Sequence, residues 1–198
     1  TITIGDSAGS ANATLSGGLA GTFTNAISVA SGNTGVAKIT DSAASIFSGA
    51  VTLNNHDLVL APAASALTLS GGVTGTGNLS LATTGAGTIT LSTASVNNTG
   101  TISNTGTGAG TSTISSVVGA NVTGLTQNSA TSALTLSGAS ANTSTGTTTV
   151  TAGTLNLNKT AGINAVGGNL VVNGGTATLL ASNQIADAKT VSVSAGSL

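Results

Sequence analysis

The chain has 198 residues, and only 4% of them are charged, with three Lys, four Asp and neither Glu nor Arg. A soluble domain normally devotes about a quarter of its residues to charge, so this surface must consist of hydroxyl, amide and methyl groups. Nucleic-acid binding depends on Lys and Arg side chains that neutralise phosphates. Lys38, Lys159 and Lys189 are too few and too scattered for that role. Composition therefore directs the search for a function toward shape and assembly.

A short phrase of alternating aliphatic residues, followed by Ser, Gly, Asn or Thr, recurs along the chain. It covers residues 66–72, 77–82, 87–92, 100–104, 112–115, 133–138, 153–158 and 167–175. Period-two alternation predicts strands that point their aliphatic side chains to one face and Thr, Ser and Asn to the other. Disorder would not require this pattern, and repetition at a short spacing is typical of a solenoid.

The spacing of these strands suits either a β-sandwich or a parallel β-helix. The second aliphatic residues of the phrases lie 10 to 12 residues apart from Leu69 to Ile114. Asn173-Gly174 is the one Asn-Gly hairpin signal, and only two Phe are present to fill a sandwich core. Small aliphatic residues suit the narrow core of stacked coils. We therefore favour the β-helix, with about 20 to 30 residues per turn and about seven to ten coils.

The sequence predicts one all-β domain over residues 1–198, a parallel β-solenoid that forms one continuous rod. Residues 93–132 are the least hydrophobic, so we expect the least regular coils or an outward loop there, whereas residues 134–180 carry the clearest repeat. Helix signals are nearly absent because Thr, Ser, Gly and Asn are poor helix formers. The stretches 61–66 and 183–189 are the two that could form short helices.

No stretch approaches the roughly 18 apolar residues of a membrane-spanning helix, so we expect no transmembrane helix. The chain opens at Thr1 without the basic and apolar regions of a signal peptide. This is expected of a processed product or of an excerpt.

Residues 134–155 resemble the autotransporter-associated β-strand repeat of bacterial passenger regions. The matching residues are Leu134, Leu136, Gly138, Asn142, Thr143, Gly146, Val150, Gly153 and Leu155. The sequence departs from the usual pattern at Ser144, at Thr147 and at an apparent insertion, Ser140-Ala141. Residues 73–92 and 156–180 resemble the segments that flank the repeat. The resemblance implies a right-handed parallel β-helix that is exported to the surface or exterior of a bacterium and has a structural or adhesive role.

Catalytic chemistry has few candidates in this chain. General acid–base catalysis needs two carboxylates, or a carboxylate and a base, at one spot. Asp favours turns because it bonds its own backbone, so we expect solvated turn residues at Asp6, Asp41, Asp57 and Asp187. A polysaccharide-degrading β-helix enzyme would require Asp41, Asp57 and His56 to share one groove.

His56 beside Asp57 invites a catalytic or metal-binding interpretation, because Asp can orient an imidazole. Neighbouring residues on a strand point to opposite faces, however, and a lone His provides no metal site. A polar turn between two strands is the simpler interpretation of residues 54–57. We predict that the protein is not an enzyme and has no metal site and no cofactor.

Thr-x-Thr triplets raise a further possibility. They occur at residues 88–90, 99–101, 111–113, 147–149 and 176–178, among others. Ranked rows of such triplets on a flat solenoid face would order water and could bind ice. The triplets fall in expected strands and turns alike, and β-branched Thr suits any exposed strand. Exposed strand positions are therefore the simpler interpretation.

Both ends of the chain are predicted to be strands without a cap. Solenoids expose unpaired N–H and C=O groups at their ends, and soluble examples cover them with charges, Pro or a helix. The candidate assembly residues are Thr1, Ile2, Thr3 and Ile4, and Thr190, Val191, Ser192 and Val193. A net charge of −1 gives little repulsion between copies.

We therefore predict a non-enzymatic, extracellular structural protein whose copies stack end to end, or exchange terminal strands, to form a surface fibre or matrix. The main alternative is a monomeric passenger stalk or adhesin on a bacterial cell surface. An ice-binding solenoid and a polysaccharide-degrading enzyme rank below it. The partners expected are other copies of the chain, with the cell surface or extracellular matrix, and no nucleic acid.

Overall fold

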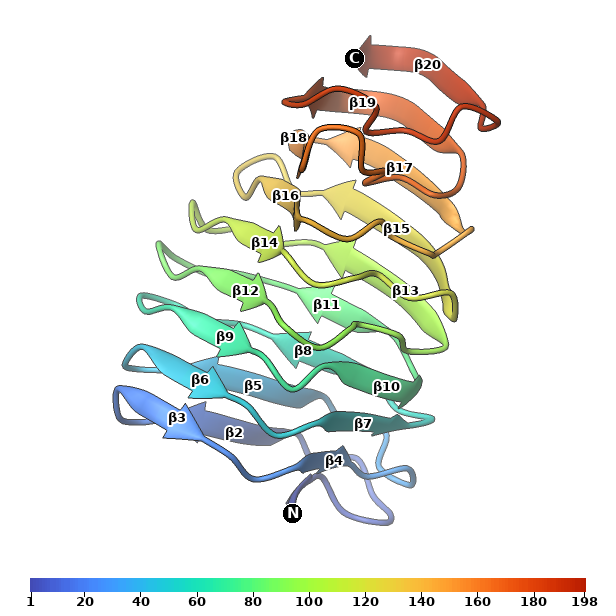
Figure 1. Ribbon diagram of the computed structural model, residues 1–198. Helices are drawn as coiled ribbons and strands as arrows, with labels where there is room; N and C mark the ends of the chain where they lie inside the picture. The colour runs from blue at the N-terminus through green and yellow to red at the C-terminus, as the bar shows by residue number, and fades with distance from the viewer.

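The protein is an all-β solenoid. The computed structural model describes every residue from 1 to 198, and the chain forms 20 strands and no helix. All strand pairs are parallel, and the chain completes about nine turns. Figure 1 shows the coils stacked in order, from the N-terminus at the bottom to the C-terminus at the top. The predicted parallel β-solenoid is confirmed, and the number of coils falls within the predicted range.

Three columns of strands run along the rod, and we call them the first, second and third faces. The first face is the four-stranded sheet, which consists of β1 (Ile2–Ile4), β4 (Ile27–Val29), β7 (Val51–Asn54) and β10 (Val73–Thr76). Beyond β10 it continues as isolated parallel bridges from Val73 to Val96 and from Val96 to Val118.

The second and third faces belong to the 16-stranded sheet. The second face contains β2 (Ala13–Gly17), β5 (Ala37–Asp41), β8 (Leu58–Leu60), β11 (Leu79–Leu81), β13 (Gly100–Asn104), β15 (Val122–Asn128) and β17 (Thr147–Ala152). The third face contains β3 (Gly21–Phe23), β6 (Ser45–Phe47), β9 (Leu67–Leu69), β12 (Ile89–Leu91), β14 (Ser112–Ile114), β16 (Leu134–Gly138) and β18 (Thr154–Lys159).

The last two strands join these faces at the C-terminal end. β19 (Leu170–Leu179) pairs with β17 through its first half and with β18 through its second half. Gly175, with φ of 69°, lies at the bend between the halves. The Asn173-Gly174 pair is therefore part of a corner and not of a hairpin. β20 (Val191–Ser197) pairs with β19 as the outermost strand.

Coil length is nearly constant along the rod. In the strand pairs the step from one coil to the next ranges from 25 residues, between Ile2 and Ile27, to 21 residues, between Leu58 and Leu79. Since parallel strands lie about 4.8 Å apart, nine coils give a rod of roughly 40 Å. Glycine corners permit this close stacking, because a Cβ at Gly49 or Gly71 would collide with the backbone of the coil beneath.

The core is a single column of side chains inside the coils. Its 33 buried hydrophobic residues form one continuous cluster, mostly of Leu, Ile and Val. The two aromatic rings, Phe23 and Phe47, stack in adjacent coils with their centroids 5.2 Å apart. Because each coil buries its inward residues against the next coil, the core has no protein neighbour beyond the first and last coils.

Residues 93–132 do not leave the solenoid as an outward loop. They contribute β13, β14 and β15, which pair with the coils on both sides. The irregularities here are two register shifts, one at Gly100/Thr101 and one at Gln127/Asn128. The low hydrophobicity of this stretch arises instead from polar side chains that point inward, among them Asn104 and Gln127, both fully buried.

The two stretches that could have been helical, 61–66 and 183–189, contain no helix. Most of their backbone hydrogen bonds go to neighbouring coils, and the one local turn is the bond from the Lys189 N–H to the Ala186 carbonyl at 3.0 Å. The Ala61 N–H donates to the Ile39 carbonyl, and the Thr84 N–H donates to the Pro62 carbonyl. In the second stretch the Gln184 carbonyl accepts the N–H groups of Ala165 and Val166.

Candidate assembly surfaces

The N-terminal candidate residues lie at one open end of the rod. Ile2, Thr3 and Ile4 form β1, the outermost strand of the first face, and Thr1 precedes it. The Ile2 N–H donates to the Ala26 carbonyl at 2.7 Å, and the Ile4 carbonyl accepts the Ala30 N–H at 2.9 Å. Because backbone groups alternate sides along a strand, the N–H and C=O of Thr3 point to the edge where no strand of this chain lies.

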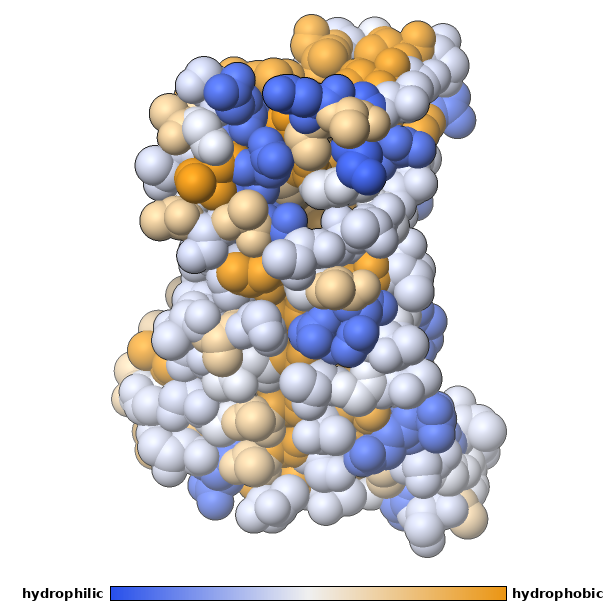
Figure 2. Space-filling model, turned by 45° about the vertical axis from the view of Figure 1, so that its right-hand side comes forward, coloured by the Kyte–Doolittle hydropathy of each residue, from blue (hydrophilic) through white to orange (hydrophobic).

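The C-terminal candidate residues lie at the opposite end. Val191, Ser192 and Val193 belong to β20, and Thr190 precedes it, with its carbonyl accepting the Leu170 N–H at 3.0 Å. Every residue of β20 is exposed. Figure 2 shows apolar side chains gathered at this upper end, above a flank that is mostly weakly hydrophilic. The two candidate sets are about one rod length apart, so a single copy does not bring them together.

Both ends expose the interior of the solenoid as well as strand edges. At the C-terminal end Val193 is 47% exposed and Leu179 is 45% exposed. At the N-terminal end Leu15 and Phe23 pack against the core but are only partly buried. These are inward-facing positions, so their exposure arises from the lack of a further coil.

Register relates the exposed residues of one end to those of the other. One inward column on the second face consists of Leu15, Ile39, Leu60, Leu81, Asn104, Gln127, Val150, Val172 and Val193. One on the third face consists of Phe23, Phe47, Leu69, Leu91, Ile114, Leu136, Leu157 and Leu179. A second copy that continued the second-face column would place Leu15 over Val193. The third-face column has eight members and the second-face column nine, so Phe23 of that copy would lie two levels above Leu179.

His56 and Asp57 do not form a catalytic pair. They line an open groove with Asn33, Thr34 and Asn55. His56 Nδ1 lies 2.8 Å from the backbone carbonyl of Asp57, while the Asp57 carboxylate accepts the backbone N–H of Asn78 at 2.7 Å. Asp41 is not among the residues that line this groove, so Asp41, Asp57 and His56 do not share one groove. No group of three His, Cys, Asp or Glu side chains gathers anywhere in the chain.

The expectation that all four aspartates are solvated turn residues is wrong for Asp41. This residue is the last of β5, where the alternation Ala37, Ile39, Asp41 turns it inward, and it is only 6% exposed. Neither carboxylate oxygen has a hydrogen-bond partner. Burial raises the pKa of this carboxyl above its ordinary value of 3.8, since desolvation disfavours the charged form.

Lys159 is a second ionisable residue inside the rod. It follows the inward residues Leu155 and Leu157 of β18 and is 1% exposed. Its Nζ donates to the Ser137 carbonyl at 2.7 Å and lies 3.5 Å from the Ser116 carbonyl, two coils below. Burial lowers the pKa of this amine from 10.5. The alternation of β5 and of β18 places both residues at inward positions, a signal that the assignment of Asp41 to a turn by residue type overlooked.

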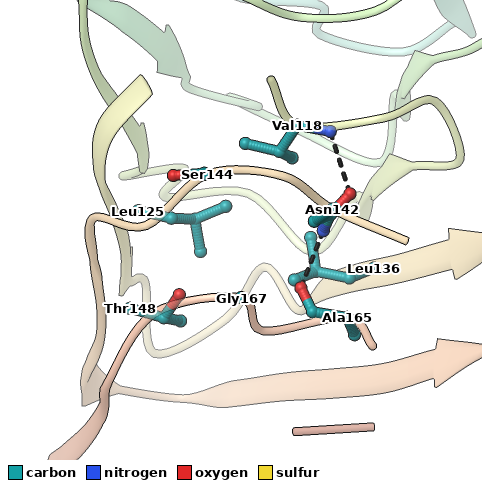
Figure 3. Close-up of a pocket in the computed structure, with 8 residues that line it drawn as sticks. All are labelled: Val118, Leu125, Leu136, Asn142, Ser144, Thr148, Ala165 and Gly167. Carbon is teal, nitrogen blue, oxygen red and sulfur yellow. Dashed lines mark hydrogen bonds between the residues drawn. The ribbon is translucent and has the colours of Figure 1, made fainter. Parts of the chain in front are cut away.

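The interior contains no pocket of ligand size. One small cavity lies between coils where the first face has no strand, and its volume is about 10 Å³, near the lower limit for one water molecule. Asn142 lies beside it and bonds to the coils on both sides (Figure 3). Its Oδ1 accepts the Val118 N–H at 2.9 Å, and its Nδ2 donates to the Ala165 carbonyl at 2.7 Å. This asparagine therefore replaces a missing backbone bridge.

No protein-family model matches the chain, and neither does any curated protein or solved structure. The resemblance of residues 134–155 to the autotransporter-associated repeat thus stays a prediction. The structure contains no helix long and apolar enough to cross a membrane.

Proposed function

We propose that this protein is a structural β-solenoid subunit that stacks end to end into an extracellular fibre or matrix on a bacterial surface. One observation carries the proposal. The inward columns that begin at Leu15 and Phe23 run in register through the whole rod and end at Val193 and Leu179, which are exposed. A second copy added at this end would bury Val193 and pair the free edge of β20.

Hydrogen bonding and apolar burial would both favour association where two copies meet. Backbone hydrogen bonds would supply affinity, as they do when an extended strand joins a sheet edge. The apolar side chains at both ends would lose exposure to water, at about 25 cal/mol for each Å² of apolar surface buried. Terminal strands β1 and β20 carry no charged side chain that would oppose the contact. Edge strands that avoid such pairing usually carry Lys, Pro or a bulge. Neither terminal strand contains Lys or Pro, although the pairing of β20 with β19 has two register shifts.

The proposed extracellular setting rests on the resemblance to passenger repeats and on the low charge of the chain. The absence of Cys is compatible with that setting. The alternative is a monomeric passenger stalk or adhesin, in which flanking chain covers the two ends of the solenoid. Both proposals assign a mechanical role to the rod, and they differ in what contacts Val193.

A matched pair of variants distinguishes these proposals. Val193→Lys places a charge on the inward column at the exposed end, where a stacked copy would bury it. Val171→Lys makes the same change one coil earlier, at an outward position of β19 that pairs with Ser192. Sedimentation velocity over a concentration series should show wild-type protein and Val171→Lys as growing assemblies and Val193→Lys as a monomer.

Two results would overturn the stacking proposal. One is wild-type protein that sediments as a monomer at every concentration, which favours the stalk. The other is a Val193→Lys variant that assembles as well as Val171→Lys, which would place the contact elsewhere. Circular dichroism of each variant checks that the β-solenoid is retained.

A further inference from the structure

The third face has the longest strand ladder without a register shift, because the first face has no shift but only four strands. Its strand pairs, from β3 to β18 and on to the second half of β19, contain no register shift. The second face has shifts in three pairs, those of β13 with β15, β15 with β17 and β19 with β20. In Figure 1 the third-face strands form the stack that runs from β3 to β18. Outward side chains on this face are therefore aligned coil after coil.

Threonine dominates the central outward column of this face. The column consists of Thr22, Ile46, Thr68, Thr90, Thr113, Thr135, Asn156 and Thr178. Two residues further on in the four central coils is a serine, within β16 at Ser137 and directly after the strand at Ser70, Ser92 and Ser115. The backbone N–H groups of these last three serines still donate to the coil below, so the ladder continues through them. The four central coils thus present Thr-x-Ser in succession. Two Thr-x-Thr triplets, 88–90 and 111–113, also lie on this face in adjacent coils.

The spacing of this array is set by the backbone. Coils lie about 4.8 Å apart along the rod, and outward residues two positions apart on a strand lie about 6.7 Å apart. The hydroxyls therefore form a two-dimensional grid, four coils long and two positions wide. The sequence-based interpretation, which held that the triplets occupy strands and turns alike, missed this grid. Residues 99–101 and 147–149 do lie elsewhere, so the alignment depends on register and not on the motif.

Most of these hydroxyls have no partner in the protein. The Oγ1 atoms of Thr68, Thr90 and Thr113 make no hydrogen bond to another residue, and the side chains are half-buried in their rows. At the borders of the grid, Asn156 Nδ2 donates to Thr135 Oγ1 at 3.4 Å and Ser115 Oγ donates to the Leu91 carbonyl at 3.3 Å. The central hydroxyls are thus free to bond water at a fixed repeat.

The third face presents no charge, which indicates the kind of surface that it could bind. No ionisable side chain points outward in either column, and Lys159, the one ionisable residue in these strands, is turned into the core. The face is therefore electrically matched to an uncharged surface. Both aromatic side chains, Phe23 and Phe47, point inward, so no ring is available to stack on sugars. A partner that uses the whole grid must itself repeat in two dimensions.

We propose that the third face binds ice, with the Thr and Ser hydroxyls bonding lattice water at regular spacing and the Thr methyl groups packing between them. This function goes beyond the structural role proposed above and does not depend on end-to-end stacking. A lone Thr would bond water transiently, whereas a fixed grid offers many bonds at once without ordering flexible side chains. Several coils are needed for the effect, and the four central coils provide them.

Thermal hysteresis and ice-crystal shaping test this proposal. Wild-type protein in dilute buffer should lower the freezing point below the melting point and produce faceted crystals, whereas serum albumin at equal mass should not. Thr90→Lys, at the centre of the grid, should reduce hysteresis to the buffer level. The matched control is Thr126→Lys, which lies at an equivalent half-buried outward position on the second face and should retain wild-type hysteresis.

Further variants separate a loss of ice binding from a loss of folding. Where Thr90→Lys fails to fold by circular dichroism, Thr68→Lys and Thr113→Lys repeat it in neighbouring coils. The Val193→Lys variant should retain hysteresis, because its third face is intact. The proposal is wrong if wild-type protein shows no hysteresis, if the second-face variant loses activity while the third-face variant does not, or if the protein binds microcrystalline cellulose or chitin without any effect on ice.

Discussion

Two neighbouring regions of the same interior column are filled by different kinds of side chain, one apolar and one polar. On the second face, Leu60 and Leu81 fill coils three and four with fully buried aliphatic side chains. In the next two coils the same positions hold Asn104 and Gln127, which are equally buried. The backbone register passes from one region to the other between Leu81 and Asn104 without a break. The interior column therefore accommodates polar side chains while the strand register is maintained.

The polar region succeeds because its groups bond one another. Asn104 Nδ2 donates to Gln127 Oε1 at 2.7 Å and to the Ser132 carbonyl at 2.8 Å. Asn104 Oδ1 accepts Ser112 Oγ at 3.3 Å, and Gln127 Nε2 donates to the Ser129 and Ser132 carbonyls at 2.9 Å. A buried amide is tolerated when its donors and acceptors are paired, because an unmade bond costs its full desolvation. Adjacent coils are therefore held together by side-chain packing in the apolar region and by buried hydrogen bonds in the polar region.

The largest effect is expected in the apolar region. Leu81→Ala removes a fully buried side chain between coils that cannot collapse easily, because their spacing is set by the strand ladder. We expect a loss of about 2 to 5 kcal/mol in the free energy of unfolding, measured by urea titration with circular dichroism. A loss below about 1 kcal/mol would show that the coils relax around the cavity.

A somewhat smaller effect is expected in the polar region. Asn104→Leu leaves Gln127 Oε1 without its donor, and we expect a loss of about 1 to 3 kcal/mol. The double variant Asn104→Leu/Gln127→Leu removes both amides, so its loss should be smaller than the sum of the two single losses by about 0.5 to 3 kcal/mol. Strict additivity in this cycle would contradict the hydrogen-bonded account of the region.

The smallest effect concerns Asp41, an inward polar residue whose oxygens have no partner. Its pKa is raised in the folded state, so between pH 3.8 and that raised pKa the folded protein binds more protons than the unfolded chain. The contribution of Asp41 to stability is therefore greatest below pH 3.8 and falls as the pH rises through the window. Urea titrations at several pH values should show this slope in wild-type protein and its loss in Asp41→Asn. An identical slope in both proteins would assign the pH dependence to other groups.

Much of the fold could be predicted from the sequence, because alternation fixes which side chains point inward. The phrases at 66–72 and 133–138 lie on the third face as strands β9 and β16, and the expected coil length agrees with the observed steps. Polar inward residues were harder to predict. Hydrophobicity marks Asn104 and Gln127 as surface residues, and only their partners in other coils, brought together by register, explain their burial.

The candidate surfaces also include features that the sequence predicts and features that it does not. Terminal strands around Ile2 and Val193 could be located from alternation alone. The match of Leu15 with Val193 could not, since it depends on the summed length of every coil between them. The Thr grid has the same origin, because it appears only when Thr68, Thr90 and Thr113 are aligned by pairing. Features that arise from register over many coils are those that a local pattern does not contain.

Electron cryomicroscopy of the wild-type protein tests the central claim, that the end coils receive a further copy, most directly. The account predicts filaments in which the strand repeat of about 4.8 Å continues through every junction on the second face, with Leu15 of one copy placed over Val193 of the next. Dispersed single rods of about nine coils at the same concentration, or filaments joined through the flanks, would contradict it.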